Sequence, residues 1–220
     1  MASTVLASGS ITADGTEQTV HTSVLAKAFV VEFDLANLAA AETVRIKVYV
    51  KVLSGGTERV VFDSGNITGV QAAPDIIRRS AAVWGPQGCK VTLQQTGGTY
   101  RAYPYTVESI ADVAVEASGT VTTDGTEQTL SAVTTNKTFV LLSDHSAQPA
   151  VTTVTLRLKQ KVTASATFRV IEQVTTASGA LSDPDKIMQS VPVPCSQGVT
   201  ATIEETGTAH NVPWALLSVG

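Results

Sequence analysis

The feature that most constrains the fold of this chain is an internal repeat. Residues 7–20 recur as residues 117–130, and both segments contain Asp-Gly-Thr-Glu-Gln-Thr, so the offset is 117 − 7 = 110 residues. This offset continues without a gap and leaves roughly a third of the aligned positions identical over about ninety residues. One residue is then lost, and Tyr103-Pro104-Tyr105 aligns with Val212-Pro213-Trp214. The chain is therefore two tandem copies of one module.

The repeat sets the expected domains at residues 1–110 and 111–220. The boundary lies near residues 109–113, where the last strand of the first copy should end and the leading strand of the second should begin. No Gly-, Ser- or Pro-rich linker separates the copies, so we expect two closely coupled modules.

Hydrophobic residues alternate with polar ones along the longest regular segment of each copy. In residues 44–52 every even position is a β-branched aliphatic residue and most odd positions are basic, a period of two that predicts a strand with one buried face. Residues 154–162 repeat the pattern, although Gln160 interrupts the apolar face. Each copy offers about eight such short segments separated by Gly-, Asn- and Pro-containing turns.

These strands predict an all-β protein of two tandem β-sandwich, jelly-roll-like domains of about eight strands each. The alanine-rich residues 35–42 are expected to form a loop with at most one helical turn, because their counterpart in the second copy is broken by Pro149. Asp14-Gly15, repeated as Asp124-Gly125, is expected to form hairpin turns.

Composition excludes several classes of function. The formal net charge of −4 gives no electrostatic basis for general nucleic-acid binding. No apolar run is long enough for a membrane-spanning helix, and Met1–Leu6 lacks the features of a signal peptide. We therefore expect synthesis and folding in a cytoplasm. Cys89 and Cys195 are expected to be free and buried, because their spacing fits neither a disulfide framework nor a zinc site.

Catalytic and metal chemistry finds little support in the sequence. None of the three histidines has a counterpart in the other copy. Ser143-Asp144-His145 contains the residue types of a hydrolytic triad, but adjacent residues rarely converge as a triad must, so a surface loop is expected. Asp183-Pro184-Asp185 has too few carboxylates for calcium and is expected to be a turn. We expect no enzyme activity, no cofactor and no metal.

Two surfaces are candidates for partner contact. The first is the outward face of the long strand, which is either a solvated, lysine-guarded face or a docking surface for an acidic protein. Its residues are Arg45, Lys47, Tyr49 and Lys51. The second is the last strand of the first copy, where Arg101, Tyr103 and Tyr105 share one face and belong to the residue types that dominate interface hot spots.

The Asp-Gly-Thr-Glu-Gln-Thr motif, the alternating strand of residues 44–52 and residues 91–101 together carry a family resemblance. The chain resembles small β-sandwich virion structural proteins of the capsid-decoration type, encoded by tailed phages and related archaeal viruses. The resemblance covers each copy almost fully. It implies a viral structural protein located in the virion, a decoration, cement or minor capsid protein, whose partners are the major capsid protein and further copies of itself.

Self-association is expected to give a homo-oligomer. Three chains would place six modules around a three-fold axis, an arrangement that suits a capsid lattice. The rival interpretation is a carbohydrate-binding or tail-associated adhesin module, for which Trp84 and Trp214 are the candidate aromatic platforms. These two residues do not align with each other, which argues against a duplicated sugar site.

Overall fold

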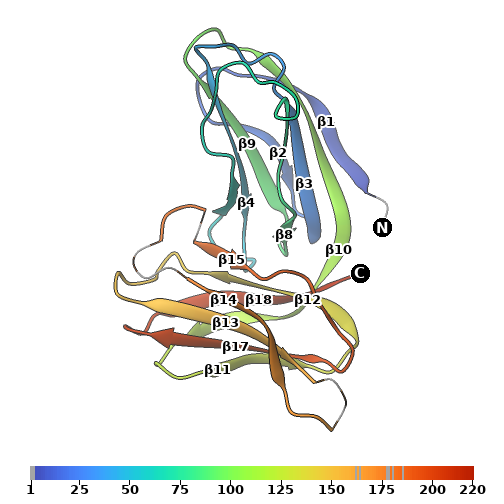
Figure 1. Ribbon diagram of the computed structural model, residues 1–220, viewed down its shortest axis with the longest axis vertical. Helices are drawn as coiled ribbons and strands as arrows, with labels where there is room; N and C mark the ends of the chain where they lie inside the picture. Colours follow the sequence, from blue (N-terminus) through green and yellow to red (C-terminus); the bar gives the residue numbers. More distant parts are fainter. Residues whose placement is uncertain (1–2, 162, 164, 177–178, 180, 185) are drawn as a thin grey trace. The chain divides into compact units, whose positions relative to one another are not determined.

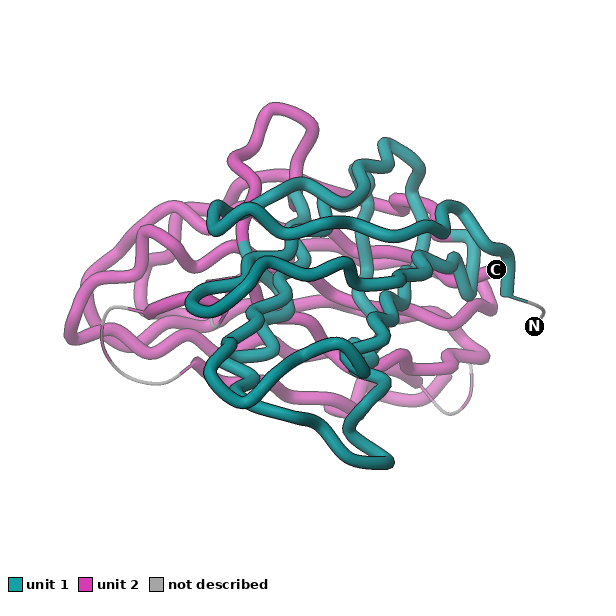
Figure 2. The backbone as a smooth tube through the Cα atoms, turned by 90° about the horizontal axis from the view of Figure 1, so that it is seen from above, with its two compact units in different colours: residues 1–51, 60–112 teal, residues 52–59, 113–220 magenta. Residues whose placement is uncertain are grey.

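The computed structural model describes residues 3–161, 163, 165–176, 179, 181–184 and 186–220. Among these residues every regular element is a β-strand, numbered β1 to β18, and the prediction of an all-β chain is confirmed. The chain divides into two units: residues 1–51 with 60–112, and residues 52–59 with 113–220 (Figure 2). They are called the first and second unit below.

The first unit consists of two antiparallel sheets (Figure 1). In one, β10 lies between β1 and β3, and β3 pairs in turn with β7 and β8. The other follows the order β2-β9-β4-β5, with β6 also paired to β4. The bounds of these strands are β1 Thr4–Thr12, β2 Gln18–Ser23, β3 Lys27–Asp34, β4 Thr43–Val50, β5 Arg59–Asp63, β6 Ile67–Thr68, β7 Ile77–Arg79, β8 Val83–Gly85, β9 Cys89–Thr96 and β10 Ala102–Thr122.

The second unit repeats this arrangement. The second half of β10 pairs with β18, β18 pairs with β12, and β12 pairs with β15 and β16. The other sheet follows the order β11-β17-β13-β14. The bounds are β11 Gln128–Val133, β12 Lys137–Asp144, β13 Thr153–Gln160, β14 Arg169–Thr175, β15 Ile187–Gln189, β16 Val193–Cys195, β17 Val199–Thr206 and β18 Asn211–Val219.

The repeat offset reappears in the irregularities of the sheets. The pairing of β1 with β10 shifts register between Val5 and Ala7, and that of β10 with β18 shifts between Val115 and Ala117, 110 residues later. A single strand, β10, continues through the expected boundary at residues 109–113. The junction between the copies is therefore a strand and not a loop, which fits the lack of a linker sequence.

Alternating sequence becomes alternating burial, as the period of two requires. Along β4 the odd positions are half-buried and the even ones fully buried, and β13 follows the same pattern up to the half-buried Gln160. Val162, expected at the end of this strand, lies outside the described residues. In the second unit the buried core cluster draws on both sheets, with Phe139 and Leu216 from one and Leu156 and Ile203 from the other. Each unit is thus a sandwich.

The Asp-Gly turns differ from expectation. Asp14 Oδ1 accepts hydrogen bonds from the backbone N–H and the hydroxyl of Thr16 at 2.9 and 2.7 Å, which closes a tight local turn. However, β1 pairs with β10 and β2 pairs with β9, so the turn carries the chain from one sheet to the other. The hairpin prediction was wrong, because turn chemistry fixes the local bend and not the strand that follows. Residues 35–42 form a loop with turns, as predicted.

Candidate functional site

The outward face of β4 in the first unit is organised around one carboxylate. Glu17 accepts hydrogen bonds from Lys47 Nζ at 2.9 Å, from the Tyr49 hydroxyl at 2.5 Å and from Thr92 Oγ1 at 2.7 Å. Burial opposes ionisation of Glu17, but the hydrogen bonds from these three residues outweigh it and lower the pKa to about 2. Glu17 is therefore charged at neutral pH and compensates the lysine beside it.

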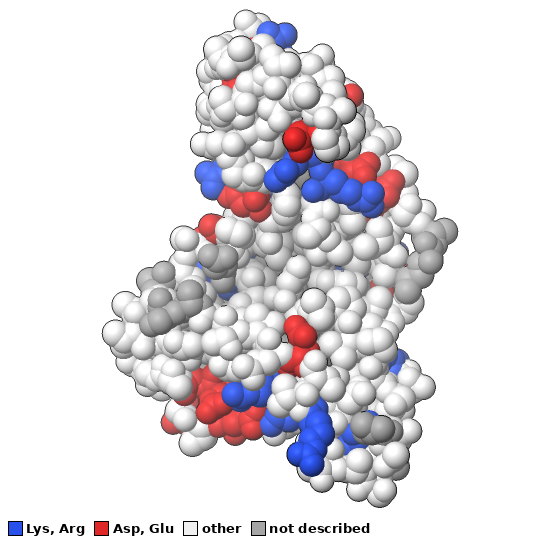
Figure 3. Space-filling model, viewed as in Figure 1, with Lys and Arg blue, Asp and Glu red and all other residues white. Residues whose placement is uncertain are grey.

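The second unit repeats this arrangement with different basic residues. Glu127 accepts hydrogen bonds from Lys159 Nζ at 2.6 Å, Arg157 Nη1 at 3.0 Å and Thr202 Oγ1 at 2.8 Å. The hydrogen bond from Lys159 is the main cause that lowers the pKa of Glu127 to about 2. We call Glu17 and Glu127, with these partners, the carboxylate hubs. Basic and acidic side chains accordingly lie together on the surface (Figure 3).

The rest of the basic face is also compensated within the chain. Arg45 holds Asp63 through both carboxylate oxygens, with Nε–Oδ1 at 2.9 Å and Nη2–Oδ2 at 2.5 Å. Lys51 follows the end of β4 and is half-buried. The side chains of Arg45, Lys47 and Tyr49 are thus engaged by the chain's own carboxylates, and any acidic partner has to compete with these contacts.

The tyrosine face of β10 points inward. Tyr105, Val107 and Ser109 lie opposite Phe33, Val31 and Phe29 of β3, so this face covers the core. Tyr103 is fully buried and donates its hydroxyl hydrogen bond to Gln95 Oε1 at 3.0 Å. The expectation that Tyr103 lies on a contact surface was wrong. Side chains at alternate positions identify a common face, but the other sheet, which contributes Gln95 of β9, decides that this face is internal.

Arg101 closes the same end of the core. Its Nε lies 2.8 and 2.7 Å from the two carboxylate oxygens of Glu42. Glu42 is only 2% exposed. Glu42 also accepts hydrogen bonds from the backbone N–H groups of Ala39 and Thr99. Arg101 is therefore a structural partner of a buried carboxylate.

Tyr105, unlike Tyr103, borders the surface. Its ring lies 6.0 Å from that of Phe33, centroid to centroid, and it lines a shallow hollow of about 120 Å³. The hollow also contains Ile77, which is 50% exposed. We call it the Tyr105 hollow, and it is lined by Glu32, Phe33, Asp34, Ile77, Pro104, Tyr105 and Thr106.

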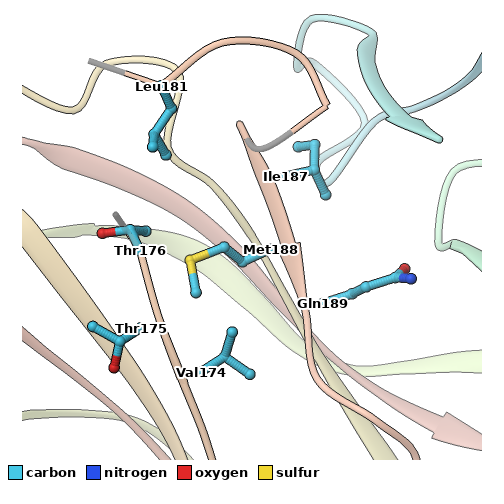
Figure 4. Close-up of a pocket in the computed structure, with 7 residues that line it drawn as sticks. All are labelled: Val174, Thr175, Thr176, Leu181, Ile187, Met188 and Gln189. Carbon is cyan, nitrogen blue, oxygen red and sulfur yellow. The ribbon is translucent and has the colours of Figure 1, made fainter. Parts of the chain in front are cut away.

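A larger cleft lies in the second unit, beside β14 and β15. It encloses about 430 Å³, and Figure 4 shows the side chains of Leu181, Met188 and Val174 around it. Thr175, Thr176, Ile187 and Gln189 complete its lining. The first copy has Arg78 and Arg79 at the positions of Met188 and Gln189, so this cleft is not a duplicated feature.

Ser143, Asp144 and His145 are not a surface loop. The three residues are 0%, 8% and 0% exposed, and Ser143 and Asp144 form the end of β12. The surface prediction was wrong because Ser143 occupies the inward position that Phe33 has in the first copy. Glu205 and His210, which sequence reasoning did not single out, are also buried in this unit. The available signal was that Glu205, aligned with Gln95, shares one strand face with the apolar Ala201 and Ile203.

Both tryptophans and both cysteines belong to the interior. Trp84 and Trp214 are 6% and 7% exposed, so neither forms the exposed platform that sugar binding would use. Cys89 and Cys195 are free and buried, as predicted. In the described part of the chain no group of His, Cys, Asp and Glu residues is placed to hold a metal ion, and no helix could span a membrane. Asp185, of the acidic Asp183-Pro184-Asp185 turn, lies outside the described residues.

The fold and these surfaces define an all-β protein built from β-sandwich units. No protein family and no curated protein matches the sequence. Solved structures with partial likeness include the tandem CBM22-1-CBM22-2 domain of Paenibacillus barcinonensis Xyn10C, at 10% identity, covering 100% of this chain and 98% of that chain with a TM-score of 0.29.

The VP2 subviral particle of infectious bursal disease virus has 14% identity and a TM-score of 0.30, covering 87% of this chain and 55% of that one. The CUB1-EGF-CUB2 segment of human MASP-1/3 has 8% identity and a TM-score of 0.26, covering 97% and 99%.

Proposed function

We propose that this chain is a non-enzymatic virion structural protein, a decoration, cement or minor capsid protein that binds the viral shell. Its partners would be the major capsid protein and further copies of itself. On this proposal it is made in the host cytoplasm and resides in the virion.

The observation that carries the proposal is what the two copies have in common. They share strand pairings, register shifts and a carboxylate hub at Glu17 and Glu127, all of which build the sandwich. They share neither histidine nor tryptophan positions. A duplication that keeps the scaffold contacts but not the potentially reactive side chains is expected of a protein that binds partners through its surface. A duplicated enzyme would be expected to keep its reacting groups in at least one recognisable set.

The Tyr105 hollow is the contact surface we favour on the first unit. It combines an aromatic ring at its rim with the half-exposed Ile77, flanked by Glu32 and Asp34. Aromatic and aliphatic anchors with a polar rim are the usual composition of an interface centre. The hollow is shallow, so it fits an apolar side chain of a shell protein better than a free small molecule.

Cosedimentation with shells assembled from the major capsid protein of the same genome tests this proposal. We expect saturable binding by the wild-type chain and at least tenfold weaker binding by the double variant Tyr105→Ala/Ile77→Ser. Val24→Ser is the matched control, because Val24 is an apolar residue of the same unit that is 84% exposed and lies outside the hollow. No binding by the wild-type chain would overturn the proposal, and equal loss in the control variant would overturn the choice of surface.

The cleft beside β14 and β15 favours a second candidate function, a carbohydrate-binding or tail-associated adhesin module. Thr175, Thr176 and Gln189 contribute polar groups there, but none of the described residues that line the cleft is aromatic. A glycan array distinguishes the two candidates. Strong hits that disappear in Met188→Arg, which introduces the residue of the first copy, would favour the adhesin.

A further inference from the structure

One end of the core in the second unit contains a cluster of ionisable and polar side chains. Ser143 lies near the end of β12, His145 directly follows this strand, Glu205 comes from β17, and His210 directly precedes β18. Ser143 and His145 are 0% exposed, Glu205 is 1% exposed and His210 is 8% exposed. Ionisable groups are rarely buried so completely without a compensating partner. We call these four residues the histidine cluster.

The contacts within the cluster leave several polar atoms uncompensated. Ser143 Oγ lies 2.6 Å from His145 Nε2. His210 Nδ1 lies 3.3 Å from Glu205 Oε2, a distance that becomes an ion pair only when the imidazole is protonated. Within the described part of the chain, His145 Nδ1, His210 Nε2 and Glu205 Oε1 have no hydrogen-bond partner. A buried polar atom without a partner lowers the free energy of unfolding by roughly 1–3 kcal/mol. This end of the core is therefore the place where the second unit should open most easily.

The first unit has the same backbone at this place without the histidines. Leu35 N–H donates to the carbonyl of Ile76, and His145 N–H donates to the carbonyl of Lys186, 110 residues later. His145 therefore replaces Leu35 in an otherwise conserved turn. Phe33 stands in place of Ser143, and Arg101, paired with Glu42, stands in place of His210. The second copy has acquired buried titratable groups that the scaffold does not need.

We propose that the histidine cluster makes the second unit acid-sensitive: proton uptake by His145 opens the end of the core where β12, β17 and β18 meet, while the first unit stays closed. This inference does not depend on the proposed function. It describes a response of the fold itself. The closed core is stable while the buried imidazole is neutral and loses stability when the imidazole takes up a proton.

Among the described residues, no carboxylate is paired with His145 to compensate its protonated form. Burial is the main cause that lowers the pKa of His145 to about 3, and the neighbouring His210 contributes to the same shift. The carboxylates nearby are engaged elsewhere in the unit. Asp144 lies 3.5 Å from Arg59, Asp183 lies 3.4 Å from Lys186, and Glu205 contacts His210.

The direction of the pH effect follows from this shift. His145 binds a proton below about pH 6.5 when the core is open but only near pH 3 when it is closed. Opening therefore becomes more favourable as the pH falls from 6.5 towards 3, and the stabilisation is fully present only above 6.5. At pH 5.0 the open fraction should rise about thirtyfold relative to pH 7.5. The carboxylate hubs keep their charge at this pH, since their pKa values are about 2.

Hydrogen exchange of the full chain at pH 7.5 and 5.0, corrected for intrinsic exchange rates, tests the proposal. We expect protection of residues 139–148 and 200–212 to fall about thirtyfold at pH 5.0. Residues 29–38 and 90–101 of the first unit serve as the internal reference. The variant His145→Leu introduces the residue of the first copy and should abolish most of the fall. His145→Gln keeps a polar group that does not titrate and should do the same if the leucine variant folds poorly.

Three results would overturn the proposal. The first is an unchanged thirtyfold fall in both His145 variants. The second is a fall that disappears in Glu205→Gln but persists in His145→Leu, which would assign the effect to the carboxyl group. The third is an equal fall in both units. Burial also lowers the pKa of His21 in the first unit. The variant His21→Ser, which introduces the residue of the second copy, is the control for its titration.

Discussion

The first unit closes one end of its core with a tyrosine and an ion pair, whereas the second closes the same end with two histidines and a glutamate. Tyr103 and the Arg101–Glu42 pair fill the space in the first unit. His145, Glu205 and His210 occupy the corresponding end of the second. The backbone hydrogen bonds around both ends match at the repeat offset. The sandwich therefore tolerates very different side chains at this end, provided that the outer strands and turns remain the same.

The outward faces of the two units, in contrast, keep the same central interaction. Glu17 and Glu127 keep the same role even though their basic partners have changed from Lys47 to Arg157 and Lys159. The threonine contacts from Thr92 and Thr202 are also retained. A carboxylate that joins two strands to the turn before a third is more constrained than the residues at the end of the core.

The largest expected difference between the units comes from removing the side chain that fills each core end. Tyr103→Ala should destabilise the first unit by about 4 kcal/mol, because it removes a fully buried ring and leaves Gln95 without its hydroxyl partner. Val212→Ala, the aligned change, should cost about 2 kcal/mol. Denaturant unfolding monitored separately through Trp84 and Trp214, in variants that retain one tryptophan, measures both values. Equal costs would show that the two core ends are packed alike.

Substitution of the carboxylate in either hub should lower stability by the same amount. Glu17→Gln and Glu127→Gln are each expected to lower stability at pH 7 by about 1 kcal/mol, a value reduced by the partial exposure of the groups involved. Their lowered pKa values place the stabilisation above pH 4.5 and remove it as the pH falls towards 2.

Urea midpoints at pH 7 and pH 2 measure this difference, and wild type and variants should converge at the lower pH. Asp75→Asn, at an exposed turn, is the control. A marked difference between the stability losses of Glu17→Gln and Glu127→Gln would show that the two hubs are not equivalent.

A smaller contrast is expected at the Asp-Gly turns. Gly15 and Gly125 have φ angles of +90° and +85°, so alanine at either position should cost about 1 kcal/mol in backbone strain. A Cβ on Gly15 would also lie 2.3 Å from the Tyr100 hydroxyl, whereas nothing lies within 4 Å at Gly125.

Gly15→Ala should therefore cost a few tenths of a kcal/mol more, and Tyr100→Ala should remove the excess. Thermal unfolding of the single and double variants tests this, and an excess that survives in the double variant contradicts the explanation.

No difference is expected between the two thiols. Burial raises the pKa of Cys89 to about 12 and that of Cys195 to about 11, so both should resist alkylation in the folded chain at pH 8 and react only on unfolding. Mass spectrometry of pulse-labelled protein resolves the two sites. Preferential labelling of Cys195 at pH 5 would sharpen the comparison, because it would indicate opening of the second unit alone.

The repeat and the alternation of residues 44–52 were sufficient to predict an all-β chain of β-sandwich units, because the period of two and the turn residues are local properties. The buried cysteines were predictable because their spacing fits neither a disulfide framework nor a zinc site. The inward orientation of Tyr103 was not predictable, since it depends on the other sheet, which contributes Gln95 of β9, packing over this face of β10. The Asp-Gly turns were misassigned because the strands on either side belong to different sheets.

The sequence by itself thus determined the duplication, the strands and the class of fold, which follow from periodicity along the chain. Only the tertiary structure decided which polar residues are buried together. Ser143, Glu205 and His210 come from different strands or strand ends, and their proximity arises from the pairing of β12 with β18 and the packing of the second sheet over them. Nothing in the spacing of these residues encodes that proximity, because nonlocal pairing brings them together.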